Sequence, residues 1–391
     1  MNAPSPDPSP LPGGIYVHIP FCQKKCLYCD FYSVSDPTLK SAFFQALIGE
    51  IRLIRDTSVS FDSIYIGGGT PSLFEPARIS KLIDSLGKSF SIDADSEITL
   101  EINPGTVDAE KLKGYRNAGV NRLSIGIQTF QNHLLETLGR VHSEKASHDA
   151  VETAHGAGFK NIGLDLIFGI PGQSRSCWET DLKRAVSYRP EHLSCYMLTF
   201  EAGTPFERAV RSGRLVPPGE DRVADQMETA ITFLTDRGYL HYEISNFSKS
   251  PHSISRHNSK YWNFSPYIGL GPSAHTFLPP DRRWNHADVR RYIEDIQAGK
   301  RPVSGRETLT RQLEMMEAVY LGLRTTAGID IQRFNRLFAA DFRKMFHDAI
   351  EIFSAGNMIS TTERCCRLTR KGILFHDGIV KQMVASIPDG S

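Results

Sequence analysis

The 391-residue chain carries 45 basic and 44 acidic residues, a net charge of +1, so it has no global field that would attract nucleic acid or an anionic membrane. With 40% hydrophobic and 23% charged residues, the composition excludes a disordered or membrane-spanning class and suits about two globular domains. Seven cysteines, three of them within eight positions, are unlike a secreted disulfide framework, so we expect a reducing, cytoplasmic location.

The chain begins with a segment that we expect to be a disordered tail. Residues 1–13 are rich in Pro and Ser and lack both the basic start and the apolar core of a secretory signal peptide. Such a composition cannot bury enough apolar surface to fold. We therefore place the first structured element after this tail.

Six short runs rich in β-branched residues follow, separated by longer segments of helical periodicity. The predicted strands cover residues 14–19, 63–68, 97–102, 122–127, 162–168 and 192–198. One intervening segment places Phe44, Leu47, Ile48, Ile51 and Ile54 on a single helical face. The alternation predicts an α/β fold with a parallel sheet, in a barrel or an open form, whose chemistry lies on loops after the strand C-termini.

Beyond about residue 250 the alternation fades. Helical patterns run from 309 to 323 and from 342 to 353, and the stretch CRLTRKGILF reads as a strand, a turn and a last helix. We expect the α/β domain over residues 14–250, a connecting segment over 251–289, and a smaller C-terminal helical domain over 290–391. The order of its elements is that of a winged-helix-like module.

Three cysteines directly follow the first predicted strand. Cys22, Cys26 and Cys29 have the spacing Cx3Cx2C, so three thiolates from one loop can bind a four-iron, four-sulfur cluster and leave one iron open to a small ligand. A zinc site is the alternative. Structural zinc, however, takes four ligands, usually in two separated pairs, and the sequence has no second CxxC pair.

The cysteine loop resembles that of the radical S-adenosylmethionine (SAM) superfamily. The segment YVHIPFCQKKCLYCDF has the superfamily's spacing, with an aromatic residue, Tyr28, before the third cysteine. The resemblance implies an incomplete (β/α)6 barrel in which SAM chelates the open iron and is cleaved by a cluster electron to a 5′-deoxyadenosyl radical. The protein would supply positioning and shielding.

Glycines and polar residues at later strand ends form the expected SAM site. GGGTP at residues 67–71 would let backbone groups approach a ligand, although the segment alone also fits a tight turn. Carboxylates suit ribose hydroxyls and an arginine can clamp a carboxylate, while strand-end caps or surface ion pairs are the alternative. By resemblance to the coproporphyrinogen dehydrogenase-like branch of the superfamily, the SAM contacts are Tyr16, Gly68, Gly69, Thr70, Glu101, Gln128, Arg140 and Asp165.

That resemblance spans about residues 14–380, and the branch contains two functional types. Oxygen-independent coproporphyrinogen dehydrogenases carry a further cysteine two positions beyond the third cluster cysteine, and a longer N-terminal extension. Here that position is Phe31, and only a short segment precedes the first strand. Instead, RHNSKYW, from Arg256 to Trp262, is similar to the HNxxYW motif of HemW-type heme chaperones.

This motif supplies the candidate heme contacts. Histidine is a usual axial ligand of heme iron and aromatic rings can stack on a porphyrin, so His257, Tyr261 and Trp262 are the predicted heme residues. A histidine beside aromatic residues is also often a packed core residue, and that alternative stays open. His275, in GLGPSAH, is left out, since a structural role or a cofactor contact suits it equally.

Other reactive side chains receive plainer interpretations. Four cysteines without partner spacing are expected to behave as small buried hydrophobes: Cys177, Cys195, Cys365 and Cys366. Lys24 and Lys25 flank the cluster loop. They would offset its negative charge or dock an acidic electron donor of the flavodoxin or ferredoxin type, although a solvated loop face is the simpler account.

The residues and the resemblance together predict a heme chaperone. It would bind heme and transfer it to an acceptor protein, with a 4Fe-4S cluster and SAM supporting delivery. The rival hypothesis is oxidative decarboxylation of coproporphyrinogen III, which Phe31 and the missing extension disfavour. Radical chemistry on an unrelated substrate is a third hypothesis. We expect no nucleic-acid partner, and no apolar run has the roughly 18 residues of a membrane span.

Overall fold

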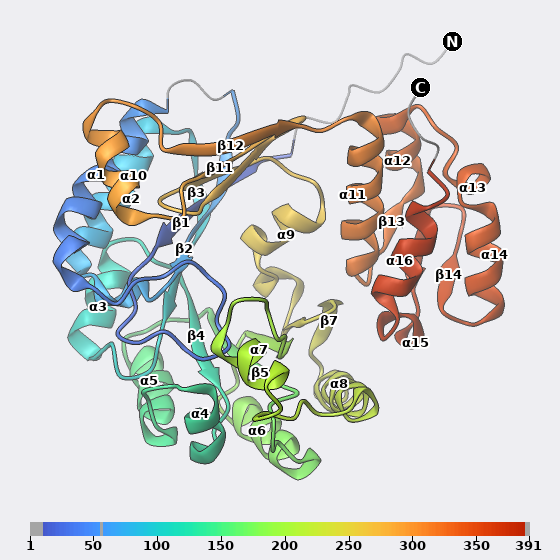
Figure 1. Ribbon diagram of the computed structural model, residues 1–391, viewed down its shortest axis with the longest axis horizontal. Helices are drawn as coiled ribbons and strands as arrows, with labels where there is room; N and C mark the ends of the chain where they lie inside the picture. The colour runs from blue at the N-terminus through green and yellow to red at the C-terminus, as the bar shows by residue number, and fades with distance from the viewer. Residues whose placement is uncertain (1–10, 55–57, 388–391) are drawn as a thin grey trace.

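Two lobes make up the described part of the chain (Figure 1). The computed structural model describes residues 11–54 and 58–387, so residues 1–10 of the predicted tail lie outside the described residues. A sheet covered by helices forms the first lobe, and the darker orange and red helices after residue 309 form the second. None of the helices in the described ranges combines the length and the apolar character that crossing a membrane requires.

The first lobe contains all six predicted strands. They are β1 (Gly13–Ile19), β2 (Phe61–Gly68), β3 (Ile92–Ile102), β4 (Arg122–Gln128), β5 (Ile162–Phe168) and β6 (His192–Met197). These strands lie side by side in chain order and run parallel. Parallel neighbours need long crossover connections, which the intervening helical segments provide.

Further strands extend both edges instead of closing the barrel. β9 (Tyr267–Leu270) pairs parallel with β1, and β10 (His275–Leu278), β11 (Asp281–Asn285) and β12 (Val303–Thr308) continue that edge antiparallel. At the other edge, β8 (Asn246–Ser248) and β7 (Leu240–Glu243) follow β6. In this strand order β1 and β6 are not neighbours, so the prediction of an incomplete (β/α)6 barrel is confirmed.

The helices of the first lobe form the layer outside the barrel and the connections at its ends. They are α1 (Lys40–Leu53), α2 (Pro76–Ser89), α3 (Ala109–Asn117), α4 (Asn132–Leu138), α5 (Glu144–Gly156), α6 (Arg175–Ser187), α7 (Pro205–Arg211), α8 (Glu220–Thr235), α9 (Arg256–Trp262) and α10 (Val289–Gln297). α1 packs between α10 and α2, α3 packs against α2 and α5, and α6 packs against α8.

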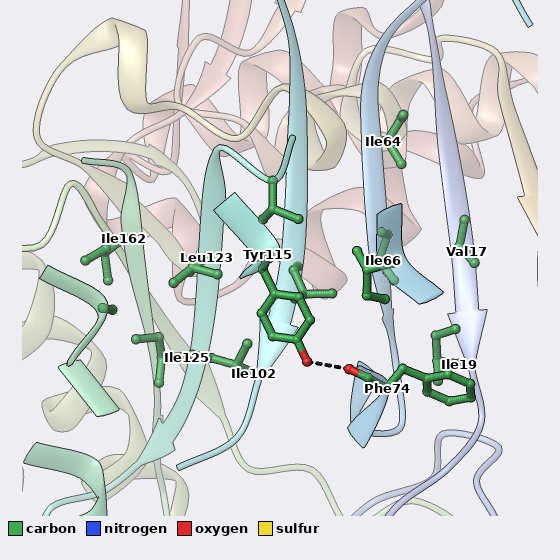
Figure 2. Close-up of a cluster of buried hydrophobic side chains, with 14 of the residues drawn as sticks. Val17, Ile19, Ile64, Ile66, Phe74, Ile102, Tyr115, Leu123, Ile125 and Ile162 are labelled. Atoms are coloured by element: carbon green, nitrogen blue, oxygen red, sulfur yellow. Dashed lines mark hydrogen bonds between the residues drawn. The ribbon is translucent and has the colours of Figure 1, made fainter. Parts of the chain in front are cut away.

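Strand residues alternate between a hydrophobic outer face and a polar inner face. Figure 2 shows Val17, Ile66 and Ile125 in the buried layer under the helices, where the Tyr115 hydroxyl donates a hydrogen bond of 2.6 Å to the carbonyl of Phe74. Because side chains along a strand point to opposite faces in turn, the intervening residues face the barrel interior. That inner set is polar and includes Tyr16, Tyr65, Glu101, Ser124 and Asp165.

The second lobe has its own hydrophobic core and contains both helices and short strands. Its elements are α11 (Arg311–Arg324), β13 (Ile329–Asp330), α12 (Ile331–Phe338), α13 (Phe342–Met345), α14 (His347–Ala355), β14 (Ile359–Thr361), β15 (Cys365–Leu368), α15 (Arg370–Ile373) and α16 (His376–Val384). The three strands form an antiparallel sheet in the order β13-β15-β14. The helix expected over 342–353 is split at Phe346, whose φ of −105° and ψ of 17° leave helical geometry.

The sheet-bearing lobe continues past residue 290, where the sequence placed the C-terminal domain. Tyr292 and Ile293 of α10 belong to the core of the first lobe, and β12 pairs with β11. The second core is built from Met315 onward. We therefore propose a boundary near residue 309, at the end of β12. The segment 251–289 likewise contributes strands to the barrel edge. The sequence analysis did not predict them, because local periodicity does not reveal short edge strands.

Candidate functional site

A cavity of about 440 Å³ lies at the C-terminal ends of the barrel strands. This is the edge of a parallel barrel where binding sites usually form. Ten of the eleven predicted cluster and SAM residues line it: Cys22, Cys26, Cys29, Gly68, Gly69, Thr70, Glu101, Gln128, Arg140 and Asp165. Tyr16 is not in this lining. Its hydroxyl lies 3.0 Å from Nδ1 of His18, lower in the barrel.

The cysteine loop is held at its neck and at its middle. Val34 donates its N–H to the carbonyl of Pro20 and accepts the N–H of Cys22, at 2.7 and 3.0 Å. Further along, the N–H of Leu27 bonds the carbonyl of Leu138 at the end of α4. These backbone bonds fix the position of the loop above the barrel.

The three cysteines are free, partly exposed and supported by hydrogen-bond donors. The Thr70 hydroxyl lies 3.7 Å from Sγ of Cys22, and Nη1 of Arg140 lies 3.6 Å from Sγ of Cys26. Within the described ranges no three His, Cys, Asp or Glu side chains are gathered tightly enough for a single metal ion. A four-iron cluster has a different requirement, because each cysteine binds its own iron. Three thiols around one cavity, with donors to two of them, fit such a cluster.

The glycine segment passes so close to the loop that side chains would not fit. The N–H groups of Gly69 and Thr70 bond the carbonyls of Ile19 and Phe21 at 2.8 and 2.7 Å. A Cβ on Gly69 would lie 2.7 Å from the carbonyl oxygen of Phe21, and Gly68 has a φ of +108°, which favours glycine. The turn is thus also part of the wall that positions the cysteine loop.

Glu101 links the glycine segment to the barrel interior. Its Oε2 accepts the N–H of Gly68 at 3.1 Å, and its Oε1 accepts the hydroxyl of Tyr65 at 2.8 Å. Burial raises the pKa of this carboxyl to about 7, against the lowering effect of its hydrogen bonds. A cationic ligand group beside Glu101 would restore the ionised form, so the site suits an ammonium or a set of hydroxyls.

Sequence reasoning missed Asn103, which connects the two sides of the cavity. Its Nδ2 donates to the Thr70 hydroxyl at 2.9 Å, while its Oδ1 accepts Nη2 of Arg140 at 2.5 Å. Nη2 also donates to the carbonyl of Gly126 at 2.8 Å. The position two residues after Glu101, at the end of β3, was the available signal. Because of this bridge, Arg140 is fixed between a cysteine and the strand ends.

The remaining two polar residues come from β4 and β5. Oδ2 of Asp165 accepts the hydroxyl of Ser124 at 2.8 Å, and burial raises the pKa of this carboxyl. Gln128 has a φ of +68°, an uncommon conformation for a residue other than glycine. It turns the end of β4 at the cavity. Tyr65 and Ser124 position these ligand candidates and were not identified from the sequence.

The HNxxYW motif lies at the opposite end of the barrel, on α9. His257 is 1% exposed and stacks on Tyr65 with ring centroids 5.2 Å apart. Its Nδ1 lies 3.3 Å from the Ser63 hydroxyl and its Nε2 3.0 Å from the Tyr261 hydroxyl. Burial lowers its pKa to about 3. In this structure both ring nitrogens of His257 therefore have protein partners.

The rest of the motif joins the two lobes. Nζ of Lys260 pairs with Asp62 of β2 at 2.8 Å, and the guanidinium of Arg324 from α11 lies 4.5 Å from the ring centroid of Trp262. His275 lies elsewhere, on β10, where it stacks on Trp284 with centroids 5.8 Å apart. α9 is thus both the floor of the barrel and a contact to the C-terminal lobe.

Comparisons with known proteins agree with this arrangement. Residues 16–185 match the protein family described as "Radical SAM superfamily", and residues 309–375 match the family described as "HemN C-terminal domain". The heme chaperone HemW of Bacillus subtilis is 36% identical over 92% of this chain and 96% of its own length, and that of Escherichia coli is 33% identical over 96% and 98%. The chain belongs to the HemW heme chaperone family.

The fold is shared with a porphyrin enzyme. The structure of the coproporphyrinogen III oxidase HemN from Escherichia coli superposes with a TM-score of 0.83 at 24% identity, covering 96% of this chain and 90% of that one. In the present chain Phe31 lines the cluster cavity, and its side chain is 64% exposed. The other cysteines do not line the cavity: Cys177, Cys195, Cys365 and Cys366.

Proposed function

We propose that this protein is a heme chaperone that binds heme and transfers it to an acceptor protein. The main support for this proposal is the similarity to HemW heme chaperones over nearly the whole length of both chains. Phe31, in place of the additional cysteine expected of coproporphyrinogen dehydrogenases, supports the same choice. Seven free cysteines fit a reducing compartment, so we place the protein in the cytoplasm.

Cys22, Cys26 and Cys29 would hold the 4Fe-4S cluster, with SAM on the open iron. When bound, the reduced cluster can supply an electron for cleavage of SAM. The chain's own residues bind and orient the cofactor. Glu101 and the Gly68–Thr70 backbone would receive its amino end, Asp165 its ribose hydroxyls, and Arg140 its carboxylate. Gln128 and Tyr16 complete the proposed set.

Partners would meet the protein at two surfaces. Lys24 and Lys25 are exposed beside the cluster cavity, where they would receive a flavodoxin- or ferredoxin-type electron donor through charge attraction. Heme would bind around the α9 motif, which contains His257, Tyr261 and Trp262. The acceptor protein would then take heme from that end of the barrel.

Hemin titration tests this function. The reconstituted protein, monitored by Soret absorbance, should bind hemin and pass it to apomyoglobin, which serves as a model acceptor. Coproporphyrinogen III, supplied with SAM and reductant, should not be converted. His257→Ala should weaken hemin binding, because Tyr261 then loses its partner. Coproporphyrinogen turnover without hemin binding would overturn the chaperone proposal in favour of the dehydrogenase.

A further inference from the structure

A second cavity, of about 680 Å³, lies between the two lobes. Its volume is well within the range of small-molecule and cofactor pockets, roughly 300–1,000 Å³. The barrel side is formed by Lys260, Tyr261, Phe264, Ser265, Tyr267, Phe277 and Arg282. The C-terminal side is formed by residues of α11 and α16, which pack against each other. No residue of the cluster cavity lines it.

The walls are mainly apolar and rich in aromatic rings. Tyr261, Phe264, Tyr267 and Phe277 form a cluster on the barrel side, with neighbouring ring centroids 4.8 Å apart for Tyr261 and Tyr267 and for Phe264 and Phe277. From the C-terminal lobe, α11 adds Leu313, Met316, Tyr320 and Leu321, and α16 adds Val380 and Val384. Such a lining suits a large, flat, apolar ligand that aromatic rings can face.

Part of this apolar surface is exposed to solvent. Leu313 is 40% exposed and Tyr320 is 43% exposed, although both line the cavity. Large apolar side chains gathered around an open pocket commonly mark a binding site. Burying them against a ligand would therefore stabilise the complex.

The cavity also offers a free positive charge. Arg282 is held by Glu317 of α11 through two hydrogen bonds of 2.8 and 2.6 Å, and Lys260 is paired with Asp62. Lys381 of α16 is exposed and lies within 4.0 Å of no carboxylate in the described part of the chain. An apolar ligand that carries carboxylates at one edge would meet Lys381 there.

The α9 motif reaches this cavity through tyrosine. Tyr261 lines the cavity, and its hydroxyl bonds Nε2 of His257, which itself lies in the barrel floor. His257 thus orients Tyr261 and does not present a ring nitrogen to the cavity. The lining contains a methionine, Met316, and the tyrosines Tyr261, Tyr267 and Tyr320, and both residue types serve as axial ligands in heme proteins.

We propose that the cavity between α9, β9 and β10 on one side and α11 and α16 on the other is the heme-binding pocket. The inference rests on the proposed heme chaperone function and gives it a location. Heme has the required chemistry, since it is a flat apolar ring with two carboxylates at one edge. The pocket lies beyond the end of the barrel opposite the cluster, and the ring contacts of His257 with Tyr65 and Tyr261 connect the linings of the two cavities.

Two substitutions at exposed lining positions test the pocket. In the cluster-loaded full-length protein, Leu313→Asp should weaken hemin binding at least tenfold, because it places a carboxylate against an apolar ligand. Lys381→Glu should weaken it several-fold by repelling the propionates. Both variants should keep the visible absorbance of the cluster, since neither residue contacts the first cavity.

Matched controls come from the same lobe. Leu337 is 60% exposed on α12 and Lys344 is exposed on α13, and neither lines the pocket. Leu337→Asp and Lys344→Glu should bind hemin within twofold of the wild type. If the wild type binds hemin and Leu313→Asp and Lys381→Glu bind it equally well, the pocket assignment is wrong while the chaperone function stands. If the wild type binds no hemin, the proposed function itself fails.

Discussion

At the scale of single residues, the glycines before Thr70 let two backbone segments of the proposed SAM site pack closely against each other. A Cβ on Gly69 would lie 2.7 Å and 2.9 Å from the carbonyl oxygens of Phe21 and Ile19. Both atoms belong to the backbone that leads into the cysteine loop. They cannot move aside in the way the end of a flexible side chain can.

Gly69→Ala should therefore displace the cysteine loop from the SAM site. We expect at least a tenfold loss of SAM affinity, measured by isothermal titration calorimetry on the reconstituted protein, and lower iron content. The control is Gly87→Ala in α2, where a Cβ meets no atom within 4 Å. There alanine should stabilise the helix by about 0.5–1 kcal/mol. Equal SAM affinity in both variants would contradict the packing argument.

Glu50 of α1 is a buried carboxyl that should make stability depend on pH. It accepts the hydroxyl of Tyr292 and the N–H of Gly271, both at 2.7 Å, and Nδ2 of Asn285 at 2.6 Å. Burial nevertheless raises its pKa to about 7. A raised pKa means that the folded state holds the proton more tightly, so this stabilisation is complete below about pH 4.5 and is lost as pH rises through 7.

Glu50→Gln should flatten this pH dependence. In urea unfolding between pH 5 and pH 8, the variant should lack up to about 3 kcal/mol of the fall in unfolding free energy that the wild type shows. Its amide should also lower stability at pH 5, because the NH2 group faces donors. Glu152→Gln, at an exposed position of α5, should keep the wild-type profile. An unchanged slope in Glu50→Gln would show that other carboxyls cause the dependence.

At the scale of elements, α9 is anchored by a buried carboxylate. Glu97 of β3 accepts the N–H groups of His257 and Arg256 at 3.2 and 3.3 Å, and it pairs with Arg122 at 3.3 Å. Asp95 also pairs with Arg256, at 3.3 Å, but its side chain is 80% exposed. The two acidic residues thus provide a buried and an exposed version of one contact.

Glu97→Gln should destabilise the protein by about 3–5 kcal/mol, because Arg122 stays buried without a counter-charge. Asp95→Asn should cost less than about 1 kcal/mol, since an exposed pair contributes little. Urea unfolding of both variants measures the difference. Hydrogen exchange should show faster opening of residues 256–262 in Glu97→Gln alone. Similar unfolding free energies for the two variants would show that Glu97 does not anchor α9.

The elements divide into those that sequence could locate and those that it could not. The six parallel strands were predictable because β-branched residues cluster locally. Cys22, Gly69 and Glu101 were predictable as site residues because their motifs at the strand ends resemble those of the radical SAM superfamily. The position of His257 was not, since its partners Ser63 and Tyr65 lie far away in the chain. The edge strands β9 to β12 were not predicted for the same reason. Their pairing depends on β1 and on each other.

At the scale of the whole molecule, the two cavities lie at opposite ends of one barrel. A chain of contacts joins them. Tyr261 bonds His257, His257 stacks on Tyr65, and the Tyr65 hydroxyl bonds Glu101 beside Gly68. The cluster site belongs to the first lobe alone, whereas the second cavity needs both lobes. Integrity of the lobe interface should therefore affect heme and SAM differently.

A substitution at Arg324 tests whether the lobe interface affects heme binding and SAM binding differently. It pairs with Glu243 of β7, which is fully buried, at 3.0 Å, and it covers the ring of Trp262. Arg324→Gln leaves this carboxylate unpaired at the interface and should cost about 3–5 kcal/mol in docking or folding. Hemin affinity should then fall at least tenfold while cluster absorbance and SAM binding persist. Arg336→Gln, at an exposed position on α12, should change none of these. Wild-type hemin affinity in Arg324→Gln would show that the pocket does not depend on this ion pair, whereas parallel loss of SAM binding would show that the lobes do not act separately.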